Sequence, residues 1–91
     1  MIYEKIKPII DEYLDGKIDI SHAADKIVDI LFPWYEHYVP LLSYNMDPWQ
    51  ARARDMLLIE DLIAVCGEVA DNRELFAMCV SQEIEERFFK Q

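Results

Sequence analysis

The chain has 91 residues, which suits one domain covering 1–91 and leaves little room for an enclosed active site beside a core. Eighteen acidic residues against nine basic ones give a net charge of −9. Because such a surface repels phosphates, direct nucleic-acid binding is disfavoured and a basic protein partner is favoured. The alternative is that the acidic surface only keeps a small protein soluble.

The first helix is predicted from apolar residues that recur at helical spacing before Gly16, which closes the run. Pro8 leaves two alternatives open for its beginning, a start near Lys7 or a kink. The first residues of the chain lack the basic-then-apolar order of a signal peptide, so we expect a cytoplasmic protein.

The second helix is predicted to begin with Asp19 or Ser21 as its cap, because either side chain can accept a hydrogen bond from a free backbone N–H. It is predicted to end at Phe32-Pro33, since the residue before a proline disfavours the helical conformation. Two acids of this helix, four residues apart, are expected to point together into water: Asp25 and Asp29.

The segment 32–49 differs in kind, because it holds six of the eleven aromatic residues and three of the four prolines. A short helix over 33–39 and a turn through 44–47 are predicted there. The aromatic side chains either plug the open end of a bundle or form a binding surface. In the second case the exposed apolar anchors would be Trp34, Tyr35 or Tyr38.

The longest apolar run predicts a helix over about 48–70. Eleven of the fifteen residues from 56 to 70 are apolar, and the polar strip through Arg54, Asp61 and Glu68 is narrow. A helix of this kind needs cover from several sides, so we expect it at the centre of a bundle. Three acids interrupt the run, which argues against a membrane span.

Local signals mark both ends of this central helix. Asp47 can cap it, and Pro48 suits the first helical position. At its far end Glu68 and Asp71 stand three residues apart and are expected to share a face. The stretch from Asp71 to Glu74 predicts a capping box for the final helix.

The pattern as a whole predicts an all-α fold: a single-domain antiparallel bundle of four main helices, with a fifth short one if the aromatic segment forms its own. Cys66 and Cys79 both lie in apolar helical patterns. Two cysteines in this setting are expected to be buried thiols in a reducing cytoplasm, and a disulfide between them is the alternative.

Familiar catalytic and metal-binding motifs are absent from the sequence. No glutamate stands three residues before His22 or His37, and no cluster of cysteine and histidine has metal-ligand spacing. A phosphate-cradling glycine loop and a nucleophile elbow are also missing. We therefore expect no enzyme activity, no cofactor and no metal, with both histidines structural or solvent-facing.

The stretch 13–27 resembles the opening of the colicin D immunity protein and its relatives. In that family an aromatic-leucine pair ends the first helix, and Lys-Ile and a small or acidic cap precede a second helix with a basic residue and an isoleucine. His22 and Ala23 depart from the family pattern. The segment 61–71 is similar in outline to the family's third helix, so the resemblance covers about two thirds of the chain. The matching residues of the opening are Tyr13, Leu14, Lys17, Ile18, Asp19, Lys26 and Ile27.

The resemblance implies an immunity protein, a helical bundle that binds a cationic RNase toxin domain and occludes its active site. In the family, acids near the end of the third helix take the place of tRNA phosphates, and the matching positions here are Glu68 and Asp71. Charge chemistry supports the same place, since a tRNA-cleaving site holds phosphates with lysine and arginine. The predicted partner-binding residues are Asp61, Glu68, Asp71, Asp25 and Asp29, with Trp34, Tyr35 and Tyr38 as apolar anchors.

Three alternatives stay open at this point. Glu68 and Asp71 could be a solvated helix end, with Asp71 capping the next helix. The chain could instead be a phage-type anti-defence protein that imitates DNA, with its acids along a long ridge rather than in a compact patch. It could also be a small ligand-binding or regulatory subunit with a pocket beside Trp34 and Tyr44.

Overall fold

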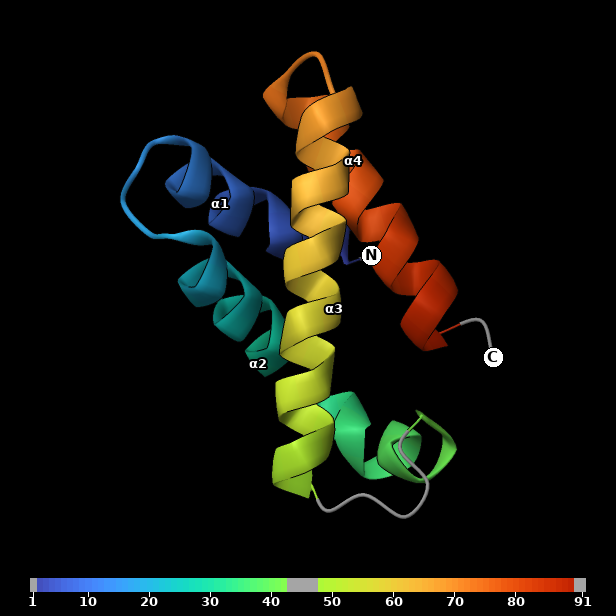
Figure 1. Ribbon diagram of the computed structural model, residues 1–91. Coiled ribbons are helices and arrows are strands. Elements are labelled where there is room, and N and C mark those ends of the chain that lie inside the picture. Colours follow the sequence, from blue (N-terminus) through green and yellow to red (C-terminus); the bar gives the residue numbers. More distant parts are fainter. Residues whose placement is uncertain (1, 43–47, 90–91) are drawn as a thin grey trace.

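The computed structural model describes the backbone of residues 2–42 and 48–89 and the side chains of 2–31 and 50–88. Its elements are the helices α1 (Tyr3–Leu14), α2 (Ile20–Leu42), α3 (Pro48–Val69) and α4 (Arg73–Ile84), followed by the π-helical turn η1 (Glu85–Phe89). Each helix packs on the next, and α4 returns to pack on α1. Figure 1 shows α3 crossing in front of α1 and α2, with α4 running back beside it. The prediction of an all-α fold of four helices is confirmed.

Gly16 ends α1 as predicted, with a positive φ of 77°. Its N–H donates to the carbonyl of Tyr13 at 3.1 Å, and the N–H of Lys17 donates to the carbonyl of Glu12 at 2.9 Å. This pair of bonds is a Schellman motif, which satisfies carbonyls at the end of a helix and favours glycine at the left-handed position. The chain therefore turns sharply here and leads directly into α2.

Two prolines lie inside helices where the sequence predicted boundaries. Helix α1 begins at Tyr3 and contains Pro8, so the alternative of a start near Lys7 is wrong. Helix α2 runs through Pro33 to Leu42, so its predicted end at Phe32-Pro33 is wrong, and so is a separate short helix over 33–39. A proline inside a helix removes one backbone donor and bends the helix without necessarily ending it. The second part of α2 (green in Figure 1) accordingly leads in a different direction from the first part (teal).

The start of α2 shows which of the two candidate caps is used. Asp19 accepts a hydrogen bond from the N–H of His22 at 2.8 Å, so Asp19 is the cap. Ser21 lies inside the helix, and its hydroxyl donates to the carboxylate of Glu60 at 2.6 Å. The Ser21 side chain therefore links α2 to α3 instead of capping α2.

The starts of α3 and α4 were also marked in the sequence. Helix α3 begins at Pro48 as predicted, whereas its proposed cap Asp47 lies outside the described residues. At α4 the cap is Asn72, whose side chain accepts a hydrogen bond from the N–H of Leu75 at 2.9 Å. The prediction that Asp71 caps this helix is wrong by one residue. A cap side chain accepts from the backbone N–H three residues later, and the residue that does so here is Asn72.

The core is one cluster between the helices, to which all four of them and η1 contribute. The core residues that α1 contributes are all isoleucines. The ring of Phe76 on α4 meets the ring of Tyr13 edge-on, with centroids 6.3 Å apart. The buried residues of the cluster are Ile6, Ile9, Ile10, Ala23, Ala24, Ile27, Val28, Leu31, Ile59, Leu62, Ile63, Cys66, Phe76, Ala77, Val80, Ile84 and Phe88.

Helix α3 does not occupy the centre of the bundle. It packs against α2 on one side and α4 on the other, while its outward side faces away from both (Figure 1). Leu57, Val65 and Val69 are consequently 63, 58 and 68% exposed. The expectation of a central helix with only a narrow polar strip in water is therefore wrong.

Candidate functional site

Two lysines on the α1–α2 side of the bundle are held in ion pairs with nearby acids. Lys7 contacts Asp11 at 2.9 Å within α1. Lys26 of α2 contacts Glu12 of α1 at 3.1 Å. Exposed pairs of this kind add little stability, but each one offsets a negative charge that a partner would otherwise meet.

Arg52 of α3 contacts both of the α2 acids that the sequence analysis assigned to partner binding. Its guanidinium donates to Asp29 at 2.6 Å and to Asp25 at 2.8 Å. These hydrogen bonds, first that to Asp29, raise the pKa of Arg52 above its usual value. The expectation that Asp25 and Asp29 simply point together into water is wrong, because packing of α3 on α2 brings a cation to them. Their role in partner binding stays a prediction, with much of their charge already offset.

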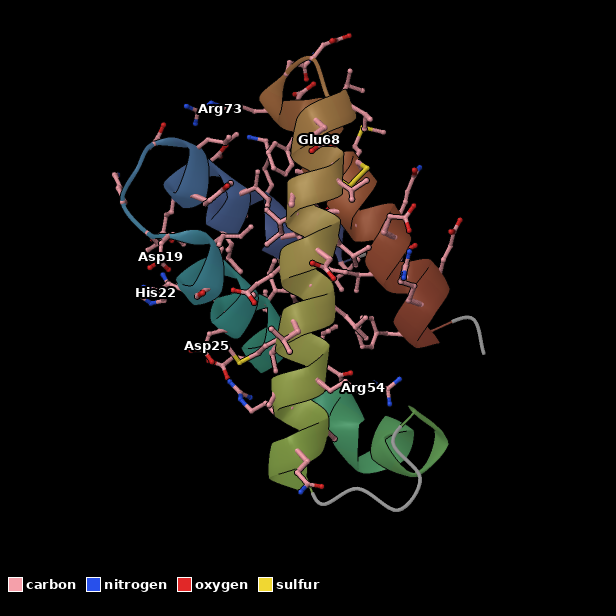
Figure 2. All side chains as sticks on the ribbon, viewed as in Figure 1. Asp19, His22, Asp25, Arg54, Glu68 and Arg73 are labelled. Atoms are coloured by element: carbon pink, nitrogen blue, oxygen red, sulfur yellow. A yellow bond between two sulfur atoms is a disulfide. The ribbon has the colours of Figure 1, made fainter. Side chains whose placement is uncertain are left out.

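Arg73, the first residue of α4, extends toward the end of α1 (Figure 2). It donates a short hydrogen bond to Asp15 and lies 3.5 Å from Asp11. The hydrogen bond from Arg73 is the largest cause that lowers the pKa of Asp15, and the same bond raises the pKa of Arg73. Acids at this corner of the bundle are therefore also neutralised from within the chain.

The outward side of α3 is different, because it mixes acids without a cation with exposed apolar side chains. Asp61 and Glu68 are exposed, and neither forms a hydrogen bond or ion pair with any side chain in the described part of the chain. Successive residues of a helix are rotated by about 100°. Asp61, Glu68 and three exposed apolar residues therefore lie together within about a third of the helix circumference. We call this set the α3 face: Leu57, Asp61, Val65, Glu68 and Val69.

Arg54 lies seven residues before Asp61, on the same line of the helix. Figure 2 shows it near the first turns of α3, well separated from Glu68 at the other end. Arg54 already takes part in an interaction within the chain. From Asp61 onwards, the charged residues of the α3 face are therefore all acidic.

Asp71 lies in the turn after α3 and not on the helix, since α3 ends at Val69. The prediction that Glu68 and Asp71 share a helix face is wrong for this reason. Asp71 is nevertheless exposed at the same end of α3 as Glu68. Within the ranges 2–31 and 50–88 its carboxylate has no hydrogen-bond or ion-pair partner.

A hollow of about 160 Å³ opens between α3 and α4, next to the α3 face. Asp61 and Val65 stand on its α3 side. Glu83 and Arg87 stand on the other side, 3.4 Å from one another. The hollow therefore offers a partner an apolar recess with the carboxylate of Asp61 on one side and the Glu83–Arg87 ion pair on the other. Its lining residues are Leu58, Asp61, Leu62, Val65, Cys66, Cys79, Glu83 and Arg87.

Cys66 of α3 and Cys79 of α4 form a disulfide that closes one wall of this hollow. It appears as the yellow bond between the two helices in Figure 2. The two Cα atoms are 5.8 Å apart, which is an ordinary separation for bridged cysteines. The expectation of two reduced, buried thiols is wrong, because α3 and α4 pack with these positions opposite one another.

A second, larger groove of about 360 Å³ lies between the first turn of α1 and the outer side of α4. Three carboxylates line it: Glu4 and Glu74 in the first turns of α1 and α4, where the helix dipole favours acids, and Glu85 at the junction of α4 and η1. The sequence analysis did not single out this groove. Its lining residues are Tyr3, Glu4, Glu74, Met78, Ser81, Gln82 and Glu85.

The sequence analysis missed the apolar part of the α3 face. Leu57, Val65 and Val69 were counted as core, because a helix that is apolar nearly all round gives no periodic signal for its exposed side. The aromatic anchors Trp34, Tyr35 and Tyr38 belong to α2, but their side chains lie outside the described residues. The predicted turn 44–47 and the pocket beside Trp34 and Tyr44 also lie outside them.

Two further observations bear on the kind of site. Among residues 2–31 and 50–88, no group of three or more histidine, cysteine, aspartate or glutamate side chains is placed to hold a metal ion. None of the helices, over the residues described, combines the length and apolar character needed to cross a membrane.

Comparison with protein-family models, with curated proteins and with solved structures finds no match for this chain.

Proposed function

We propose that this chain is an immunity protein, which binds the cationic nuclease domain of a bacteriocin or contact-dependent toxin and occludes its active site. The observation that carries the proposal is the α3 face, where Asp61 and Glu68 stand exposed without a cation beside exposed leucine and valine side chains. The resemblance of 13–27 to the colicin D immunity family points to the same function.

The chemistry of the α3 face matches a nuclease active site. An enzyme that cleaves tRNA holds phosphates with lysine and arginine, and carboxylates on a rigid helix can take the place of those phosphates. Asp61 and Glu68 are seven residues apart, which is about 10 Å along a helix, so they can meet two separate cations. Their charge also speeds encounter with a basic partner.

The apolar residues of the α3 face would exclude water from the contact with a partner, which charged residues alone cannot do. Interface energy is concentrated in desolvated side chains at the centre of a contact, with polar groups around them. Leu57, Val65 and Val69 lie beside the two acids, so a partner seated there would exclude water from the ion pairs. Ion pairs in such surroundings are stronger than exposed ones.

The size of the α3 face sets how much more of the surface takes part. From Leu57 to Val69 it is about 18 Å long, and a standard interface needs about 800 Å² from each partner. One helix face is too small for that area. The contact therefore extends across the hollow to Glu83 on α4 and over the turn to Asp71.

The proposed mechanism is occlusion, without cofactor or turnover. The test uses the nuclease domain encoded by the gene next to that of this chain, expressed alone and together with it. We expect the domain to cleave tRNA and stop growth, and we expect this chain to restore growth and bind the domain in purified form.

Two outcomes would overturn the proposal. One is a neighbouring gene without a cationic toxin domain, and the other is a toxin domain whose cleavage continues at saturating amounts of this chain. Inhibition of a DNA-cleaving host nuclease instead would favour the anti-defence alternative. The α3 face is tested within the same assay by Glu68→Lys, with Glu4→Lys on the distant first turn of α1 as a control of equal charge change.

A further inference from the structure

The disulfide closes a loop that contains the acidic end of the proposed binding surface. Cys66 and Cys79 are thirteen residues apart, and Glu68 and Asp71 lie between them. The bond therefore links the last turn of α3 to the middle of α4. Any change in this bond acts on the positions of those two carboxylates.

Apart from the disulfide, the segment 67–75 from the end of α3 to the first turn of α4 is held by the Asn72 cap and by the pairs of Arg73 with Asp15 and Asp11. Every residue from 67 to 75 except the half-buried Ala70 is exposed. The nearest buried support is the ring of Phe76, which lies so close to Gly67 that an added Cβ would be 3.3 Å from it. Exposed segments with few buried contacts are the first parts of a protein to open. The Asn72 cap and the Arg73 pairs hold the α4 end of this segment, so its α3 end, which carries Glu68, depends most on the covalent link.

The disulfide can be approached while the protein is folded. Cys66 is only 1% exposed, but Cys79 is half-buried, and both cysteines line the hollow of about 160 Å³ between α3 and α4. A thiol can therefore enter the hollow and attack the sulfur of Cys79. A disulfide sealed inside a core would instead require unfolding first.

We propose that the Cys66–Cys79 disulfide is a redox-sensitive clasp that regulates partner binding through the turn 67–75. Closed, it holds Glu68 and Asp71 in place for the partner. Opened by a dithiol reductant, it frees the turn and weakens binding while the rest of the bundle stays folded. The regulatory part of this inference rests on the proposed immunity function, whereas the effect on the turn does not.

A dithiol reduces the Cys66–Cys79 disulfide in two successive thiol–disulfide exchanges. A thiolate of the dithiol attacks the sulfur of Cys79, the bond between the two protein sulfurs breaks, and Cys66 leaves as a thiolate that takes up a proton. The second thiol of the reagent then attacks the mixed disulfide and releases Cys79. The protein gains two electrons and two protons, and the dithiol becomes a cyclic disulfide.

The charges around the hollow predict which reductants open the clasp fastest. Asp61 and Glu83 stand at its walls with Arg87 as the single described cation in the lining, and the whole chain carries a net charge of −9. An anionic thiol such as glutathione is therefore repelled, while a neutral dithiol such as dithiothreitol is not. Added salt should accelerate reduction by glutathione and leave reduction by dithiothreitol nearly unchanged.

The first experiment follows hydrogen exchange of backbone amides in the purified full chain, oxidised and after treatment with dithiothreitol. We expect exchange in 67–75 to rise about tenfold or more on reduction, as expected when a loop of this length is released. Exchange in α1 should change little. Iodoacetamide should label no cysteine before treatment and two afterwards.

The control is the Cys66→Ala/Cys79→Ala variant, which should match the reduced wild type in exchange and ignore dithiothreitol. Equal exchange of the turn in oxidised and reduced wild type would overturn the clasp, and so would two labelled cysteines in untreated native protein. The second experiment measures affinity for the neighbouring nuclease domain in both redox states, with at least a tenfold loss expected on reduction. Unchanged affinity despite a loosened turn would overturn the regulation. A responsive turn with no binding in either state would instead count against the immunity function.

Discussion

The α1–α2 half of this bundle and the outward side of α3 both carry acidic side chains, but they differ in how many of those acids are paired with a cation. In residues 2–31, five of the seven acids take part in ion pairs, with partners that include Arg52 and Arg73 from the other half. On the outward side of α3, Asp61 and Glu68 have no such partner among the described side chains. The availability of charge to a partner therefore depends on pairing and not on composition. The one arginine of α3 in these pairs, Arg52, neutralises acids of α2 and not those on the outward side of its own helix.

The largest effect is expected from reversing charge on the α3 face. Asp61→Lys and Glu68→Lys should each weaken binding of the nuclease domain by about 2 kcal/mol or more, and together by about a thousandfold. Replaced carboxylates leave the partner's cations unpaired, and the new lysines repel them. The measurement is calorimetric titration, with thermal melts to show an intact fold.

The matched control for this prediction is Glu4→Lys, which makes the same charge change on α1. It should reduce affinity only slightly, through long-range attraction that salt screens. Equal losses for Glu4→Lys and Glu68→Lys would erase the difference between the two regions, leaving net charge as the only source of attraction.

The next effect tests the exposure of α3, with two leucines on the same helix. Leu62 is 5% exposed and Leu57 is 63% exposed. Leu62→Ala should lower the free energy of unfolding by about 2–5 kcal/mol, because it leaves a cavity in the core. Leu57→Ala should change it by no more than about 0.5 kcal/mol, since the side chain is already in water.

Urea denaturation measures both variants directly. A large loss of stability for Leu57→Ala would mean that the outward side of α3 is covered in solution, contrary to the fold described above. Partner binding provides a second measurement, since Leu57→Ala should lower affinity even though it leaves stability nearly unchanged.

The smallest effect concerns the paired corner formed by Arg73 and Asp15. The pKa of Asp15 is lowered below its ordinary value of 3.8 by the hydrogen bond from Arg73. A carboxyl with a lowered pKa in the folded state adds stability above its unfolded pKa, and that stability is lost as the pH falls through the folded value. Arg73→Gln should therefore lower the melting temperature slightly at neutral pH, and the difference from wild type should shrink as the pH falls below the ordinary Asp15 value of 3.8.

Asp15→Asn provides the companion measurement for this pair. In that background, Arg73→Gln should have a smaller effect at neutral pH, and the change in this effect with acid should also be smaller. A difference between Arg73→Gln and wild type that stays constant from neutral to acid pH would show that Asp15 is not the partner that matters.

Much of the fold could be predicted from the sequence because its signals are local. Gly16 ends α1 and Pro48 begins α3 as expected, since a left-handed turn and a fixed φ act within a few residues. The cap before α4 was predicted one residue early, because Asp71 and Asn72 are both good caps and only backbone geometry decides between them. Contrary to the prediction, Pro33 did not end α2, because the residues on both sides of it are helical.

The candidate site was predictable only in part. That Asp61 and Glu68 lie on one side of α3 follows from their spacing of seven residues, whatever packs against the helix. The exposure of Leu57 and Val65 did not follow, because a nearly all-apolar helix does not reveal which of its sides will be covered.

The sequence by itself determined that this chain is helical, that one helix ends at Gly16 and another begins at Pro48, and that it carries a strong negative charge. Only the tertiary structure decided that Arg52 neutralises Asp25 and Asp29, that Cys66 meets Cys79, and that α3 turns one side to water. The physical reason is one of range. Caps, turns and composition act through neighbouring residues, whereas pairing and exposure depend on which helix faces meet.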